Sequence, residues 1–390
     1  MNRHYGIWLT LLVILMTSAM LIACAQPTPA SKPTTPAPSP SPPTMPVPAP
    51  SPKPTPTPTP APAWKPPEFI RLGVPSTAGA GYAAAVAMYS AIEKATGVKF
   101  PATAGALPAS RFQLLNNGTV DFSWMTAGEL FFLLKGAEDF AQVGPQSVRT
   151  MWDGGGLDQG LATRNDTGIK TVPDLKGKKV ASYDTYPAAQ VIMEGALAWG
   201  NLTWNDVNRV PVAGYAQGQD ALLKGQVDAA IVSSTAAQAQ EMAASTRGIY
   251  WIPYPNVTSG DKAAWARFQK IMPVYYPNRT TNAAGVSKDK PVDIWAYNYQ
   301  VVCWDTTSND MVYWIVKQMA ENYNAYKSAS PFVAKWTLDH ALQPSIWFSP
   351  RHTGAIKYYK DAGRWTAEME RVQQQLLTMY PQTKTQKKGS

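Results

Sequence analysis

The chain has 390 residues, a formal net charge of +9 and only two cysteines. Seven basic residues lie in the two terminal segments, which contain no acid, so the segment from Glu68 to Pro381 carries a net charge of only +2. A nearly neutral folded part excludes a nucleic-acid-binding footprint, and two cysteines exclude a disulfide framework. The segment is long enough for two lobes, each with its own core.

The N-terminus has the pattern of a secretory signal. Arg3 and His4 precede Ile7 to Ile22, which are almost wholly apolar. The sequence Leu21-Ile22-Ala23-Cys24 is typical of a bacterial lipobox, so we expect residues 1–23 to be a signal peptide and Cys24 to be lipidated. An uncleaved membrane anchor is the alternative. Both interpretations place the rest of the chain outside the cytoplasm and at the membrane.

Residues 24–67 are a proline-rich linker. Between Pro27 and Pro67 lie 19 of the 35 prolines, mixed with Ser, Thr and Ala. Such a composition forms no packed core, and an extended polyproline II chain of this length has a reach on the order of 100 Å. We therefore expect a spacer between the membrane and the folded part.

The first strand and helix of the folded part are predicted between Ile70 and Thr96. Ile70 to Val74 suit a short strand, the loop from Pro75 to Tyr82 contains Gly79 and Gly81, and an alanine-rich helix follows. A glycine loop that opens a helix presents unpaired backbone N–H groups, which favour an anion such as a carboxylate. The same arrangement also occurs as a plain connection in many α/β proteins.

A helix–glycine–strand corner occurs twice, about a hundred residues apart. Gly118 and Asp121 precede the predicted strand Phe122 to Met125, and Gly225 and Asp228 precede Ala229 to Val232. The repeat predicts two α/β lobes of similar construction.

Later elements complete this arrangement. We predict a turn and short helix around Asp174 before a strand from Val180, the longest strand from Val292 to Trp304, and helices over Asn309 to Ala325 and Thr366 to Met379. The predicted boundaries are residues 68–162 for the first part of lobe 1, 163–290 for lobe 2, 291–381 for the return to lobe 1 and 382–390 for a basic tail. The chain would cross between the lobes twice, with a cleft at the hinge.

Taken together, these stretches resemble the TAXI-type solute receptors of TRAP transporters. The resemblance covers Glu68 to about Tyr380 and includes the first glycine loop, both corners, Asp174-Leu-Lys-Gly-Lys-Lys-Val and His352-Thr-Gly-Ala-Ile-Lys-Tyr-Tyr. It implies a two-lobed α/β clamp of the type II periplasmic-binding-protein class, a monomer, a small organic anion as ligand and a sodium-coupled TRAP-type permease as partner. It implies no cofactor and no enzymatic activity.

The candidate ligand-binding residues come from the resemblance and from their positions at strand and helix ends. They are Thr77, Gly79, Gly81, Tyr82, Arg111, Thr126, Trp152, Tyr183, Tyr186, Ser234 and Thr235. Arg111 begins a helix, where its guanidinium would clamp a carboxylate, and the hydroxyls of Ser234 and Thr235 follow the second corner strand. Tyr183 and Tyr186 follow the strand from Val180, at the carboxyl end where α/β sheets bind ligands.

Each candidate also has a structural interpretation. Arg111 would be a solvated helix-start arginine, and the two tyrosines and Trp152, which precedes Asp153-Gly-Gly-Gly, would be packing residues. Relative to the resembled family, small polar groups near Tyr183 and Tyr186 are replaced by aromatic ones, which suggests an acid with a larger or more apolar body than glutamate.

Enzyme chemistry has little support in the sequence. Only His340 and His352 lie in the folded part, and no Cys/His cluster, nucleophilic Ser motif or phosphate-binding loop is present. Two alternatives to TRAP transport stay open: a sensor read by a membrane kinase or chemoreceptor, and a receptor for an ABC importer.

Overall fold

The computed structural model describes residues 64–77, 80–255 and 261–381, all within one compact unit, Pro62–Ser390. The predicted signal peptide 1–23, the lipidation site Cys24, nearly all of the linker 24–67 and the tail 382–390 lie outside the described residues, as does Gly79. In the part of the chain that the structure describes, no helix has both the length and the apolar character needed to cross a membrane.

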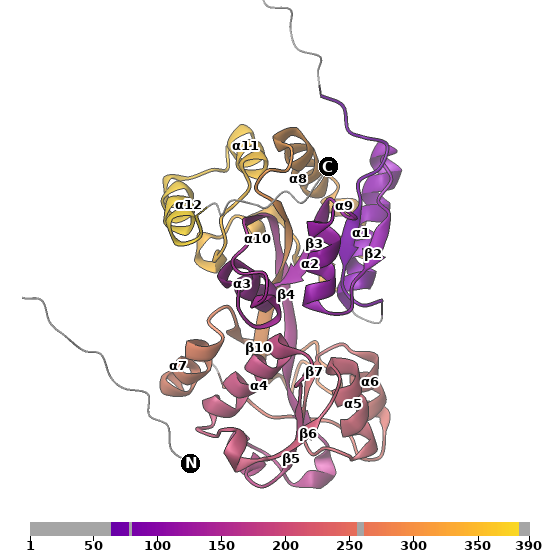
Figure 1. Ribbon diagram of the computed structural model, residues 1–390. Coiled ribbons are helices and arrows are strands. Elements are labelled where there is room, and N and C mark those ends of the chain that lie inside the picture. The colour runs from indigo at the N-terminus through magenta and orange to yellow at the C-terminus, as the bar shows by residue number, and fades with distance from the viewer. Residues whose placement is uncertain (1–63, 78–79, 256–260, 382–390) are drawn as a thin grey trace, which may run out of the picture. The chain divides into compact units, whose positions relative to one another are not determined.

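One mixed sheet joins the two lobes (Figure 1). Its main strands lie in the order β2-β1-β3-β10-β4-β7, while β8 pairs with β4 and β9 pairs with β10. β1 is parallel to β2 and β3, whereas β10 is antiparallel to both β3 and β4. The strands of this sheet are β1 (Leu72–Val74), β2 (Ala102–Ala104), β3 (Phe122–Thr126), β4 (Val148–Thr163), β7 (Ala230–Ser233), β8 (Tyr250–Trp251), β9 (Tyr276–Thr280) and β10 (Val292–Trp304).

The long strands β4 and β10 run from one lobe into the other (Figure 1). All 16 residues of β4 are buried, and β10 combines valines with aromatic residues that suit a pleated, covered surface. The expected α/β fold of two lobes joined by two crossings is confirmed, and β10 has the predicted bounds.

The lobe at the top of Figure 1 contains both ends of the described chain. Its helices are α1 (Ala80–Thr96), α2 (Pro108–Asn116), α3 (Ala127–Lys135), α8 (Asn309–Glu321), α9 (Tyr323–Tyr326), α10 (Leu338–Ala341), α11 (Thr353–Asp361) and α12 (Ala367–Met379), with the 3-10 helices η1 (Glu138–Phe140), η6 (Val333–Lys335) and η7 (Pro344–Ile346). The predicted helix from Asn309 to Ala325 is divided, because Asn322 ends α8 and its amide donates back to the carbonyl oxygen of Gln318.

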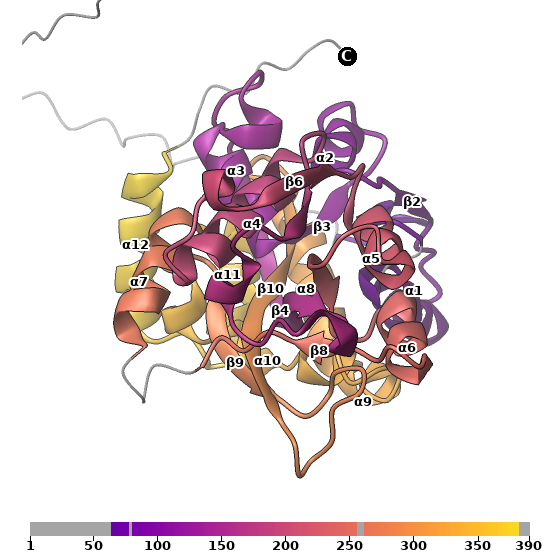
Figure 2. The same ribbon diagram turned by 90° about the horizontal axis from the view of Figure 1, so that it is seen from below.

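The other lobe is built around β7 and a small parallel sheet of two strands. Figures 1 and 2 both show α4 and α7 on the left of this lobe and α5 and α6 on its right, so the two pairs of helices lie on opposite sides of it. The elements of this lobe are β5 (Lys179–Ser182), β6 (Asn208–Pro211), α4 (Pro187–Trp199), α5 (Tyr215–Lys224), α6 (Ala237–Ala244), α7 (Lys262–Ile271), η2 (Asn165–Thr167), η3 (Val172–Leu175) and η4 (Trp204–Asp206).

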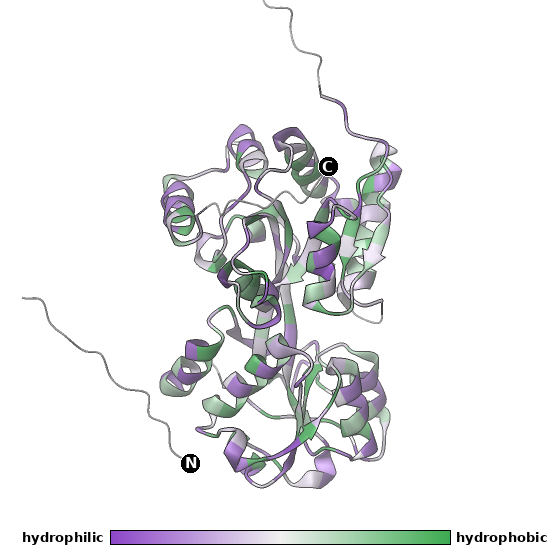
Figure 3. Ribbon diagram, in the orientation of Figure 1, coloured by the Kyte–Doolittle hydropathy of each residue, from purple (hydrophilic) through white to green (hydrophobic). Residues whose placement is uncertain are grey.

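Apolar residues concentrate on the strands and on the inner faces of the helices (Figure 3). Both predicted corners end in a left-handed glycine, with φ of 72° at Gly118 and 76° at Gly225. A residue with a Cβ is strained in this conformation, so glycine is the residue that reverses the chain into each buried strand. Cys303 is buried in β10, where burial raises the pKa of its thiol to about 12.

Candidate solute-binding site

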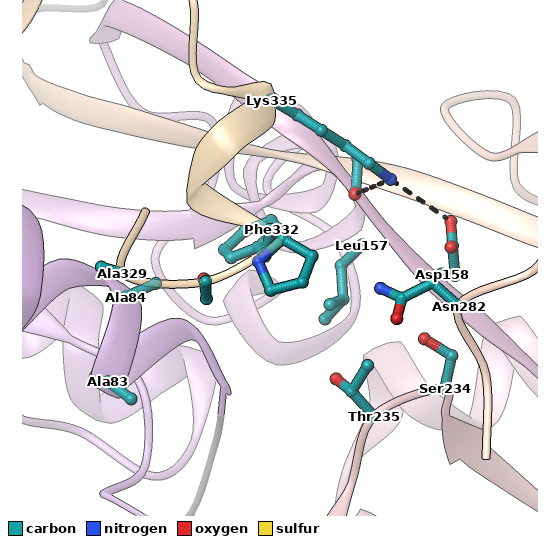
Figure 4. A pocket seen from close by; sticks show the side chains of 13 residues that line it. Ala83, Ala84, Leu157, Asp158, Ser234, Thr235, Asn282, Ala329, Phe332 and Lys335 are labelled. Atoms are coloured by element: carbon teal, nitrogen blue, oxygen red, sulfur yellow. Dashed lines mark hydrogen bonds and ion pairs between the residues drawn. The ribbon is translucent and has the colours of Figure 1, made fainter. Parts of the chain in front are cut away.

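A cavity of about 200 Å³ lies where elements of both lobes meet the crossing strand β4 (Figure 4). We call it the solute cavity. It is lined by Ala83, Ala84, Gly156, Leu157, Asp158, Ser234, Thr235, Asn282, Ala329, Ser330, Pro331, Phe332 and Lys335.

The two sides of the solute cavity differ in polarity. The side formed by α1 and the segment 329–332 presents small or apolar groups, among them Ala83, Ala84 and Phe332. The side formed by the other lobe presents two hydroxyls and an amide, from Ser234, Thr235 and Asn282 (Figure 4). A cavity with one apolar and one polar side suits a small amphipathic solute.

One cation and one acid line the solute cavity. The Nζ of Lys335 lies 3.3 Å from the carbonyl oxygen of Gly156 and 3.9 Å from Oδ1 of Asp158. Asp158 is buried and already accepts hydrogen bonds of 2.7 Å from both Asn278 Nδ2 and Thr280 Oγ1. Lys335 keeps 46% of its side chain exposed, so its ammonium is held loosely and has free donor capacity.

The start of α1 also faces the cavity. Ala83 and Ala84 belong to the first turns of this 17-residue helix, whose first turn contains no acid. The N-terminal end of a helix dipole favours a negative charge, in the same direction as the ammonium of Lys335.

Arg111 lies outside the lining of the solute cavity and is occupied by protein partners. Its Nη2 pairs with Glu129 Oε1 and its Nη1 donates to the carbonyl oxygen of Gly105 at 2.6 Å. Burial disfavours the charged guanidinium, but Glu129 outweighs this cost and raises the pKa of Arg111. Arg111 is thus neither solvated nor free to clamp a solute in this structure.

Glu129 also joins the two lobes. The hydroxyl of Tyr186, at the start of α4, donates to Glu129 Oε1 at 3.0 Å, and the backbone N–H of Thr126 donates to Oε2 at 2.9 Å. We call Arg111, Thr126, Glu129 and Tyr186 the Glu129 network. Beside it, the N–H of Ala188 in α4 donates to Asp139 of η1 at 2.8 Å. Carboxylates of one lobe therefore occupy the start of α4 in the other.

The remaining candidate residues are scattered. Ser234 and Thr235 are brought together in the solute cavity, whereas Tyr183 is buried within its lobe and accepts a 3.1 Å hydrogen bond from the N–H of Ile231. Trp152 is a fully buried residue of β4. In the first loop, Thr77 is exposed in a turn, Tyr82 is half-buried, and Gly81 is so close to Tyr299 that a Cβ there would lie 3.1 Å from its hydroxyl.

Sequence reasoning missed Lys335, Asp158 and Asn282, although each lines the solute cavity. They lie on three segments far apart in the chain, and no local motif marks any of them. Asp158 comes two residues after the last glycine of the run Gly154–Gly156, and this run is the single signal that pointed near it.

The chain is similar to several solved structures at low sequence identity. Among solved structures, the alkanesulfonate-binding protein of Xanthomonas axonopodis pv. citri bound to MOPS is 16% identical, with 79% of this chain and 84% of that chain covered and a TM-score of 0.41. A mutant of ArgBP from T. maritima is 14% identical over 69% and 95% of the two chains, with a TM-score of 0.39. A structure described as a periplasmic transporter is 14% identical over 80% and 98%, with a TM-score of 0.46.

No curated protein sequence matches the chain significantly. A family model described as the NMT1-like family matches residues 72–363, which include both lobes and every residue that lines the solute cavity. The chain therefore belongs to the NMT1-like family.

Proposed function

We propose that this protein is an extracytoplasmic receptor that captures a small organic anion between its lobes and delivers it to a TRAP-type permease. The observation that carries the proposal is Lys335, a half-exposed ammonium at the edge of a cavity that both lobes line. A solute carboxylate there would gain a charge-assisted hydrogen bond, while the buried Asp158 keeps the hydrogen bonds from Asn278 and Thr280.

The arrangement of the walls supports a binding mechanism by closure. Ser234 and Thr235 belong to one lobe, and Ala83 and Phe332 to the other, so a solute gains the full set of contacts only when the lobes are together. Affinity for the closed state then shifts the population of the receptor toward it, and a permease can recognise that state. The role requires binding and closure, with no catalytic step.

The partner and the location are inferred from sequence motifs. The order of the corners, the Asp174-Leu-Lys-Gly-Lys-Lys-Val stretch and the His352 stretch supports a TAXI-type receptor, and the lipobox at Cys24 supports a lipid-anchored protein. Sensing for a membrane kinase and delivery to an ABC importer are the alternatives. A permease gene of the TRAP type beside this gene would support transport, and a sensor gene there would support the first alternative.

A ligand screen tests the proposal. The protein is refolded to remove carried solute and heated with amino acids, dicarboxylates, hydroxy acids and aromatic acids in separate wells. A solute at 100 times its dissociation constant stabilises the folded state by about 2.7 kcal/mol, a shift of several degrees. Matched amines and neutral sugars serve as controls. Stabilisation by these controls and by none of the acids would contradict an anion receptor.

A further inference from the structure

Gly154 and Gly155 of β4 lie directly beneath the segment that carries Lys335 and Trp336. A Cβ on Gly154 would lie 2.0 Å from the ring of Trp336, and one on Gly155 would lie 2.1 Å from the Cβ of Lys335. These separations are impossible for real atoms, so a side chain at either position forces the overlying segment away from the strand.

A left-handed backbone does not explain these glycines. Among the described glycines with positive φ, none belongs to the run, so a residue with a Cβ would fit the local backbone of β4. Glycine weakens a strand, because it loses more entropy on folding and packs no side chain. The pairing of β4 with β10 is irregular here, since Gly154 and Gly155 lie between the paired residues Asp153 and Gly156 while Tyr299 alone lies between Gln300 and Asn298. Such a bulge tolerates glycine, and the close approach of Lys335 and Trp336 in addition excludes a Cβ from Gly154 and Gly155. At Gly156 a Cβ would instead meet the hydroxyl of Tyr276 at 2.2 Å.

Trp336 anchors that segment. Its fully buried ring stacks on Trp124 with centroids 4.1 Å apart and meets Phe332 edge-on at 5.6 Å. Trp336 packs against Gly154 and Lys335 packs against Gly155. The backbone of Lys335 is therefore held at a defined distance from β4. From there its Nζ reaches the carbonyl oxygen of Gly156 at the edge of the solute cavity.

We infer that Gly154 and Gly155 are positioning residues for solute binding: they let Lys335 and Trp336 lie against β4 and so place the Lys335 ammonium in the solute cavity. This inference rests on the proposed function, because it assigns the glycines a role in holding the group that binds the anion. They act through Lys335 and contact no solute themselves.

The first test follows Lys335 itself. Lysines are dimethylated with ¹³C-formaldehyde, and the Lys335 signal is assigned by its loss in Lys335→Gln. The spectrum is recorded with and without glutamate, succinate or phenylacetate in the wild type, in Gly155→Ala and in Gly195→Ala. Gly195 is the matched control, because a Cβ there would meet only ordinary contacts of 3.6 Å or more.

We expect an acid that binds to shift the Lys335 signal in the wild type and in Gly195→Ala, and to bind Gly155→Ala about tenfold more weakly or worse, as for the loss of a charge-assisted hydrogen bond. Equal affinity and an equal shift in Gly155→Ala would overturn the inference while the proposed function stands. Binding of an acid with no shift of the Lys335 signal would overturn the inference and the role of Lys335, while the receptor would still bind an anion. Absence of binding by any acid in the wild type would overturn the proposed function.

A second test remains informative if Gly155→Ala is unstable. A double-mutant cycle combines Gly155→Ala with Lys335→Gly, which removes the Cβ 2.1 Å from the new methyl group but leaves the carbonyl oxygen of residue 335 at 2.9 Å, so the relief is partial. Denaturant unfolding is measured for all four proteins. We expect Gly155→Ala to lower the midpoint less in the Lys335→Gly background than in the wild type. An equal loss in both backgrounds would show that Gly155 does not position Lys335.

Discussion

The two lobes meet at two charged regions, the Glu129 network and the solute cavity. Each contains a cation and a carboxylate, but the two regions differ in how deeply these charges are buried and how closely they pair. In the Glu129 network, the guanidinium of Arg111 and the carboxylate are 2% and 4% exposed, and Glu129 accepts from three protein donors. In the solute cavity, the ammonium of Lys335 is about half exposed and lies 3.9 Å from its acid. A buried and paired charge holds the structure together, whereas a loosely paired charge at a cavity is available to a solute.

Removal of the carboxylate from the Glu129 network tests its structural role and has the largest expected effect. In Glu129→Gln the buried guanidinium of Arg111 loses its counter-charge, so we expect the free energy of unfolding to fall by about 3–5 kcal/mol. Denaturant unfolding measures this change. The control is Glu93→Gln, which breaks a solvent-exposed pair with Lys99 and is expected to cost far less. Similar losses in both variants would contradict a larger structural role for the buried Glu129 pair than for an exposed ion pair.

Low pH tests a third part of the molecule, His352, which belongs neither to the Glu129 network nor to the solute cavity. Burial lowers the pKa of His352 from 6.5 to about 4, and its Nδ1 accepts the N–H of Gly354 at the start of α11. The unfolded chain binds this proton more readily, so the stabilisation is present above pH 6.5 and is lost as the pH falls toward 4, by roughly 3 kcal/mol.

His352→Asn provides the matched variant for the acid experiment, because asparagine retains a helix-capping acceptor but does not titrate. We expect unfolding free energies measured between pH 7 and 4 to fall less steeply in this variant than in the wild type. Parallel curves would show that other groups control the acid response.

Tyr186→Phe tests the contribution of a single hydrogen bond in the Glu129 network. The variant removes the hydroxyl that donates to Glu129 across the lobes, and we expect a loss of about 1 kcal/mol, since Glu129 keeps Arg111 and the N–H of Thr126. Thermal unfolding measures it. The control Tyr323→Phe removes a hydroxyl that bonds the carbonyl oxygen of Ala334 within one lobe. If closure depends on Tyr186, small-angle scattering will show a larger radius of gyration for Tyr186→Phe alone.

The smallest effect on stability is expected at the solute cavity. Lys335→Gln removes a half-exposed ammonium whose ion pair is long, so we expect the free energy of unfolding to change by under about 0.5 kcal/mol. Denaturant unfolding in the absence of acids checks this. A loss of several kcal/mol would mean that Lys335 supports the fold in the way that Glu129 does.

Local sequence signals predicted much of the fold. The bounds of β10 follow from a long segment rich in Trp, Tyr and Val, and both corners follow from a glycine before a buried strand. The strand over Asp153 to Gly156 was harder to predict, because glycines usually interrupt a strand. Trp336 and Lys335, whose close packing leaves no room for side chains there, belong to a segment far away in sequence.

The candidate site was predicted less well, for a related reason. Ser234 and Thr235 were found because they follow a recognisable strand. The pairing of Arg111 with Glu129 was not predicted, since no local pattern shows that a carboxylate 18 residues away will bury it. Lys335 was missed because its function depends on β4, which lies far from it in sequence.

The central claim is that Lys335 binds the solute anion, and calorimetry of one acid against three proteins tests it most directly. The acid with the largest stabilisation in the screen is titrated into the wild type, Lys335→Gln and Lys317→Gln, which removes an exposed lysine of α8. We predict that Lys335→Gln weakens binding about 10- to 100-fold and that Lys317→Gln binds like the wild type. Unchanged affinity in a folded Lys335→Gln would contradict the account, because the anion would then be held elsewhere.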